Sequence, residues 1–89
     1  MDIVTNVKLK MDDQYSFSIS QEMAPRHLVE VALVYRRDGV AKGFVPCNEW
    51  ATCWVGKDSD DDVIRLLNGH EVADLLLLAK EYIYTKDNR

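Results

Sequence analysis

The sequence predicts an α+β fold, in which an antiparallel β-meander of four to five strands is followed by two C-terminal helices packed on one face of the sheet. Apolar and polar residues alternate over much of residues 1–56, which is the period of a half-buried strand. Residues 57–89 change to apolar spacings of three and four, which is the period of a helix. At 89 residues, the chain is expected to form a single domain, mainly β over 1–56 and mainly α over 57–89.

The first two strands are expected to form a hairpin with one apolar face and one polar face. The apolar positions are Ile3, Val7, Leu9, Met11, Tyr15, Phe17 and Ile19. The alternate positions are Asn6, Lys8, Lys10, Ser16, Ser18 and Ser20. This alternation is typical of an antiparallel sheet that has one face on the core and one in water.

A second hairpin is expected after a connection over residues 21–27. Residues 28–36 are largely apolar on both faces, which indicates a central strand. The Asp-Gly pair at 38–39 favours a tight turn, and the return strand is expected over 40–45. Residues 50–55 fit either a fifth strand or a short helical turn, because their periodicity does not distinguish the two.

The C-terminal third is expected to contain two helices. Ser59 and Asp62 have the spacing of a capping box, which predicts a helix that begins at Ser59 and ends at the Asn-Gly pair 68–69. A second helix is expected from about His70 to Tyr84, with an apolar face at spacings of three and four. Leu77 and Leu78 widen that face beyond what one sheet needs, which indicates either groove filling or contact with another subunit.

The composition is that of a folded cytoplasmic protein. Hydrophobic residues make up 47% of the chain and charged residues 29%. No secretory signal is recognised, and the longest apolar run, 75–79, is far too short to span a bilayer. No membrane association is therefore predicted. Cys47 and Cys53 are expected to be free, buried thiols in a reducing compartment.

The charge distribution favours a protein partner. Residues 1–46 hold equal numbers of acidic and basic side chains, so the net charge of −4 lies in residues 47–89. This distribution argues against direct binding of nucleic acid, which needs a basic surface. The acidic cluster is formed by Asp58, Asp60, Asp61 and Asp62. It is expected to contribute to partner binding, and it does not match a calcium loop, whose turn glycine and bidentate glutamate are missing.

The two tryptophans are further candidates for partner binding. Trp50 and Trp54 are four residues apart, so they share a face in either a helix or a strand. Tryptophan is enriched at binding hot spots, but small domains also use it to complete a core. The sequence leaves both possibilities open for this pair.

The sequence therefore predicts a small non-enzymatic protein-interaction or regulatory module that forms a homodimer. One alternative is an acidic inhibitor that occupies the nucleic-acid-binding groove of another protein, as small phage-borne inhibitors do. Another is a small ligand-binding or enzyme subunit that uses Cys53 or His70. No catalytic motif, phosphate-binding glycine loop or metal-ligand spacing is recognised, so no catalytic residue, cofactor or metal is predicted.

Overall fold

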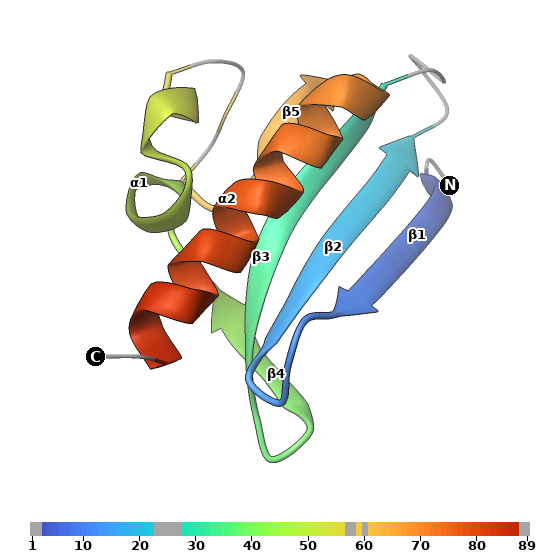
Figure 1. Ribbon diagram of the computed structural model, residues 1–89. Coiled ribbons are helices and arrows are strands. Elements are labelled where there is room, and N and C mark those ends of the chain that lie inside the picture. Colours follow the sequence, from blue (N-terminus) through green and yellow to red (C-terminus); the bar gives the residue numbers. More distant parts are fainter. Residues whose placement is uncertain (1–2, 23–27, 57–58, 60, 88–89) are drawn as a thin grey trace.

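The computed structural model describes residues 3–22, 28–56, 59 and 61–87. It contains a twisted antiparallel sheet with one long helix across it (Figure 1). The strands are β1 Ile3–Lys10, β2 Tyr15–Glu22, β3 Val29–Arg37, β4 Val40–Phe44 and β5 Ile64–Leu67. The helices are α1 Cys47–Trp50, the 3-10 turn η1 Thr52–Trp54 and α2 Gly69–Asp87. The predicted α+β class and the predicted meander of β1 to β4 are confirmed.

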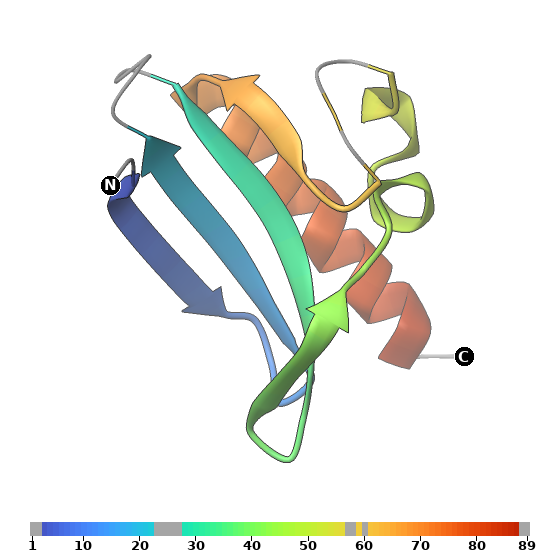
Figure 2. The same cartoon turned by 180° about the vertical axis from the view of Figure 1, so that it is seen from behind.

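β3 is the central strand, as its two apolar faces predict. It pairs with β2 along one side. Along the other side, its N-terminal half pairs with β5, with Val29 opposite Leu67, and its C-terminal half pairs with β4, with Val34 opposite Phe44. The two short strands therefore follow one another along the same edge of β3 (Figure 2).

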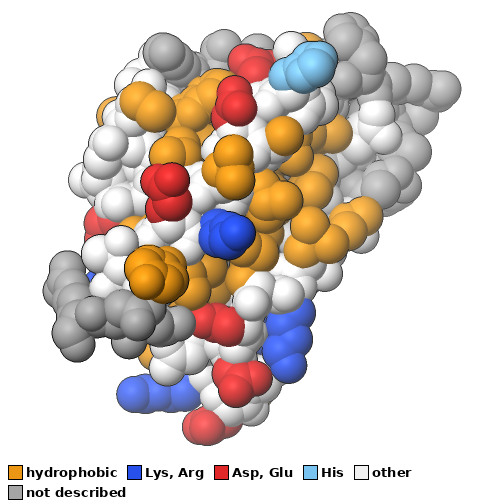
Figure 3. Space-filling view, viewed as in Figure 1, with side chains coloured by type: hydrophobic (Ala, Val, Ile, Leu, Met, Phe, Trp, Pro, Cys, Tyr) orange, Lys and Arg blue, Asp and Glu red, His pale blue; other side chains and the backbone are white. Residues whose placement is uncertain are grey.

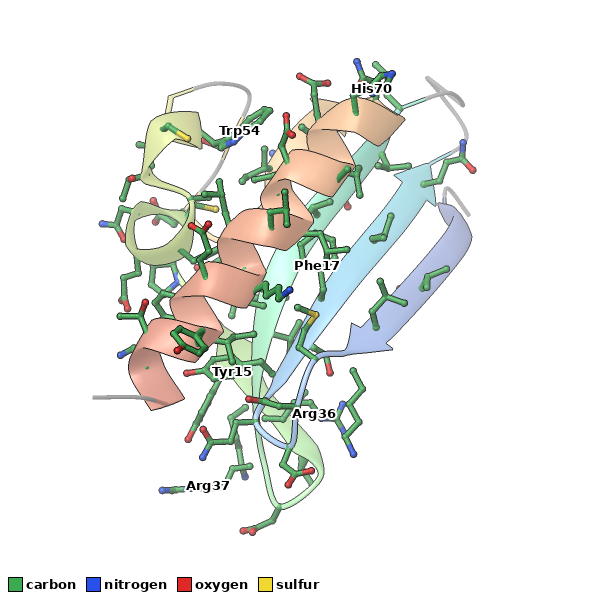
Figure 4. The ribbon with its side chains drawn as sticks, viewed as in Figure 1. Tyr15, Phe17, Arg36, Arg37, Trp54 and His70 are labelled. Atoms are coloured by element: carbon green, nitrogen blue, oxygen red, sulfur yellow. The ribbon has the colours of Figure 1, made fainter. Side chains whose placement is uncertain are left out.

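The core lies between α2 and one face of the sheet. Tyr15 and Phe17 project from β2 beneath α2 (Figure 4), which contributes the buried residues Leu75 and Ala79 to the same cluster. Phe17 is fully buried and meets the ring of Trp50 edge-on, with 6.1 Å between the ring centroids. The apolar alternation of β2 and the apolar stripe of α2 thus form opposite walls of one core.

The prediction of a helix that begins at Ser59 and ends at the Asn-Gly pair 68–69 is wrong. Residues 64–67 form β5, and Ser59 makes an isolated β-bridge with Ile64. The Ser59 hydroxyl closes a loop, since it donates to the carbonyl of Trp54 at 3.3 Å and accepts from the amide of Gly56 at 3.2 Å. A helix of this length is marginal by itself, whereas pairing with β3 provides ladder hydrogen bonds and buries Ile64 completely. Only one substantial helix is therefore present among the described residues.

The Asn-Gly pair at 68–69 starts a helix and does not end one. The Asn68 side-chain oxygen accepts from the Glu71 amide at 3.0 Å, and the Glu71 carboxylate accepts from the Asn68 amide at 2.9 Å. These reciprocal bonds make a capping box, so the motif exists nine residues after the predicted one, at the start of α2. The helix predicted over 70–84 is confirmed as α2. No helix among the described residues combines the length and apolarity needed to cross a membrane.

Residues 47–56 take the helical alternative. α1 and η1 are two short turns that follow Pro46 and pack beside α2 (Figure 1). The amide of Cys47 donates to the carbonyl of Asp61 at 2.7 Å, which ties the start of α1 to the segment that leads into β5. A strand here would have had to compete with β5 for the edge of β3.

Candidate functional site

Exposed apolar side chains gather between α2 and β1. Val7 and Leu9 of β1 are 41% and 40% exposed, and Leu77 and Tyr84 of α2 are 59% and 69% exposed. Figure 3 shows apolar side chains forming a band along this side of the helix. We call Val7, Leu9, Met11, Leu77 and Tyr84 the α2–β1 surface. Apolar patches of this kind mark interaction sites more often than isolated exposed residues do.

The surface exists because α2 does not reach the outermost strand. In the register of the first hairpin, Val7 is opposite Ile19 and Leu9 is opposite Phe17, so both residues point to the helix side of the sheet. α2 packs against β2 and β5. Val7 and Leu9 therefore lie on the core side of the sheet but beyond the helix that covers the core.

A hollow of about 610 Å³ lies at the C-terminal end of this surface. Met11 and Asp12, which follow β1, form one side, and Leu77 and Tyr84 of α2 form the other. Lys80 and Glu81 of α2 also line it and carry opposite charges. The hollow is thus apolar at its centre and polar at its margin, which is the usual anatomy of an interface.

β1 also presents an available backbone edge. It pairs with β2 on one side, and none of the described strands pairs with its other side. Its amide and carbonyl groups can therefore accept a further strand. On the face away from the helix, β1 carries exposed Lys8 and Lys10; Lys10 lies 3.6 Å from Asp13, a fully solvated pair that adds little stability.

Of the predicted partner-binding residues that the structure describes, Leu77 alone lies on the α2–β1 surface. Leu78 lies on the opposite flank of α2 and packs partly against the core. Trp50 is 4% exposed and belongs to the core, and its indole N–H has no hydrogen-bond acceptor among the described residues. Trp54 is half-buried against the core, between α1 and α2 (Figure 4). The tryptophans thus do not form a joint exposed face.

The predicted acidic cluster is described only in part. Asp61 is exposed and Asp62 half-buried, and both line a second hollow with Glu49 of α1. Asp58 and Asp60 lie outside the described residues. The contact role of this cluster, and with it the acidic-inhibitor function, stays a prediction.

The thiols and the histidine considered for an enzyme subunit differ in their exposure to solvent. Cys47 is buried, whereas Cys53 is exposed on η1, so the expectation that Cys53 is buried is wrong. The reason is that η1 turns its middle residue outward while Trp54 packs inward. His70 is exposed in the first turn of α2 (Figure 4). Within the part of the chain that is described, no three His, Cys, Asp or Glu side chains gather to hold a metal ion.

One titratable group on the core side of α2 has a shifted pKa. Desolvation by burial, with smaller contributions from Tyr15 and Glu49, raises the pKa of Tyr82 from 10.0 to about 12. The Tyr82 hydroxyl donates to the Glu49 carboxylate at 3.2 Å, which joins α2 to α1. This hydrogen bond lies on the flank of α2 away from β1, outside the α2–β1 surface.

Sequence reasoning did not identify Val7, Leu9 and Tyr84 as site residues. The alternation that assigns Val7 and Leu9 to a strand predicts them to be core residues, and only the helix position shows that they are uncovered. Comparison of the chain with family models, curated proteins and solved structures gave no match.

Proposed function

We propose that the protein is an interaction module that forms a homodimer through the α2–β1 surface. The observation that carries this proposal is the coincidence of an available strand edge with exposed apolar side chains from both β1 and α2. Association through this edge extends the sheet and covers Val7, Leu9 and Leu77 in one step. A second copy is the simplest occupant, because a two-fold axis beside β1 brings identical antiparallel strands together.

The charges on β1 select a register for that pairing. Residues opposite one another in an antiparallel pair point to the same face, so Val7 can lie opposite Val7 of the second copy. Lys8 is then opposite Asn6 of the second copy. A shift by one residue on each strand would place Lys8 opposite Lys8, where like charges destabilise the pair. We therefore expect the register centred on Val7.

Strand pairing alone does not account for a stable dimer. Specific interfaces bury at least about 1,200 Å² in total. The side chains of Leu77 and Tyr84, which flank β1, supply the additional apolar area on the helix side. Both elements of the α2–β1 surface are thus expected to contribute to the interface.

The test is sedimentation velocity of the purified protein over a range of concentrations. We expect a concentration-dependent species of twice the 10.2 kDa chain mass. Val7→Glu and Leu77→Glu, one on each element, should shift the equilibrium toward monomer. Val40→Glu is the matched control, because Val40 is 56% exposed at the start of β4, away from this surface.

Circular dichroism of each variant separates loss of dimer from loss of fold. A wild-type protein that remains monomeric at its highest soluble concentration would refute the dimer. A dimer that Val40→Glu weakens as much as Leu77→Glu does would refute the assignment of the α2–β1 surface as its interface.

A further inference from the structure

The sheet face opposite α2, called the open face below, is partly exposed: Asn6, Lys8 and Lys10 are exposed, whereas Ser16, Ala32 and Val34 are buried. None of the described helices covers it, and β4 passes in front of the lower part of β3 on this side (Figure 2). The register of the strands places three cross-strand rows on this face: Asn6–Ser20–Glu30, Lys8–Ser18–Ala32 and Lys10–Ser16–Val34–Phe44. The face is thus built from serines and lysines at one side and small or apolar residues at the other.

A groove of about 500 Å³ runs across this face. Ser18 and Ala32 form part of its lining, and such short side chains leave the middle of the sheet hollow. Lys8 of β1 lines the groove together with Lys42 and Phe44 of β4. The side chain of Phe44 is 51% exposed, which is a large exposed fraction for an aromatic residue.

Positive charge predominates around this groove. Lys8 and Lys42 line it and make no ion pair with any described residue. Arg65 of β5 lies 3.3 Å from Glu30, which is the one carboxylate among the described residues that line the groove, and offsets its charge. The sheet face is therefore basic, even though the whole chain carries a net charge of −4.

Apart from Glu30, no carboxylate among the described residues lines the groove. Glu71, Asp74 and Glu81 belong to α2, and Glu49 belongs to α1. α2 lies on the far side of the sheet from the groove, and α1 lies beside the sheet next to α2 (Figures 1 and 2). A polyanion that approaches the open face consequently meets lysine first and is separated from the carboxylates of α2 by the sheet.

We propose that the open face binds single-stranded nucleic acid. Single strands are held by cationic grooves that follow the phosphates, with aromatic side chains on which bases stack. Lys8 and Lys42 would contact phosphates, Phe44 would stack on a base, and the serine hydroxyls would bond to base edges. An acidic peptide satisfies the lysines equally well, but it leaves the exposed ring of Phe44 unexplained.

The site is complete within one chain, so it does not depend on the proposed dimer. It also differs from a duplex-binding site, because stacking on Phe44 requires an unpaired base. The proposed nucleic-acid site thus lies on a surface that the net charges of the two sequence halves do not indicate.

Fluorescence anisotropy with a labelled oligothymidylate of about 15 nucleotides at low salt is the first test. We expect saturable binding that weakens as salt increases. Lys8→Gln and Lys42→Gln should each weaken binding and reduce the dependence on salt. Lys86→Gln is the matched control, because it removes one exposed lysine from α2, on the helix side, and should leave binding unchanged.

Phe44→Leu tests stacking while it keeps the charge constant. Loss of a stacked base at about 1–3 kcal/mol corresponds to roughly 5- to 150-fold weaker binding of the oligonucleotide. Polyglutamate of similar charge serves as the competing ligand, and the same sequence in duplex form serves as a third probe. Circular dichroism confirms that each variant is folded.

Three outcomes would overturn the proposal. The first is no binding of the oligonucleotide at low salt. The second is binding of polyglutamate as tight as that of the oligonucleotide with no effect of Phe44→Leu on either, which would assign the face to an acidic protein. The third is tighter binding of the duplex than of the single strand.

Discussion

Gly69→Ala is expected to stabilise the protein. The sequence pattern alone places Gly69 just after a helix, where glycine usually adopts a positive φ and alanine is unfavourable. In the structure Gly69 is instead the first residue of α2, and it is not among the positive-φ residues. The two assignments predict opposite signs for one substitution.

The expected magnitude follows from the surroundings of Gly69. A Cβ added there meets no heavy atom within 4 Å, so alanine introduces no clash. Alanine at a compatible backbone position stabilises by about 0.4–1 kcal/mol, mainly because the unfolded chain loses freedom. With a urea m-value of about 1 kcal/mol per molar, the unfolding midpoint should rise by roughly 0.4–1 M.

The assay is equilibrium urea unfolding followed by far-ultraviolet circular dichroism. Gly39→Ala is the matched control, since a Cβ at Gly39 also meets nothing within 4 Å but its φ is +78°. This substitution should destabilise by about 1 kcal/mol, because a left-handed conformation is unfavourable for alanine. Both variants are measured at a fixed protein concentration, which keeps any contribution of association constant.

A lowered midpoint for Gly69→Ala would refute the placement of the helix start. Asn68→Ala gives an independent check, because it removes the side chain that accepts from the Glu71 amide at 3.0 Å. We expect a loss of about 1 kcal/mol, and Asn68→Asp should retain most of the stability, since aspartate caps as well as asparagine. Equal effects of Asn68→Ala and Asn68→Asp would mean that the cap is not formed.

Two further predictions concern titration and thiol reactivity. The pKa of Tyr82 is raised to about 12, so unfolded chains ionise this group from about pH 10 while folded chains do not. The contribution of Tyr82 to stability should therefore be constant below pH 10 and decline between pH 10 and 12, and Tyr82→Phe should reduce that decline in urea unfolding at alkaline pH. With a thiol reagent, exposed Cys53 should react in the native protein and buried Cys47 only after unfolding; equal rates would contradict the assigned burial.

Elements defined by local periodicity could be predicted from the sequence. The alternation from Tyr15 to Ile19 depends only on which side chains share a face, and it places β2 correctly. The same is true of the 3.6-residue period of α2. The central position of β3 followed from its two apolar faces, because a strand in the middle of a sheet is more often covered on both faces than an edge strand is.

β5 could not be predicted, because its pairing partner is distant in sequence. Val31 and Ile64 are opposite one another across more than 30 residues, and no local pattern in 64–67 indicates that β3 has a vacant edge there. Ser59 with Asp62 and Asn68 with Glu71 both have the spacing of a capping box. The choice between them depends on which following segment can bury its apolar face, and that is a tertiary property.

The same limit applies to the candidate surfaces. Leu77 was predicted from the excess width of the apolar face of α2, which is a local property. Val7 and Leu9 could not be, since their exposure depends on how far α2 extends across the sheet. Figure 3 shows this uncovered side directly. Local pattern thus identifies which residues are apolar, and the fold decides which of them stay uncovered.

The fold brings together lysines that are distant in the sequence. Lys8 and Lys42 belong to a sequence half with no net charge, yet both line the open-face groove, because strand alternation and the β3–β4 hairpin direct them to one side of the sheet. Of the acidic residues in 47–89, Glu49 belongs to α1, Glu71, Asp74, Glu81 and Asp87 belong to α2, and the other four lie at 58 and 60–62. An acidic protein with an isoelectric point of about 5.0 can therefore present a locally basic groove, provided that its lysines gather there.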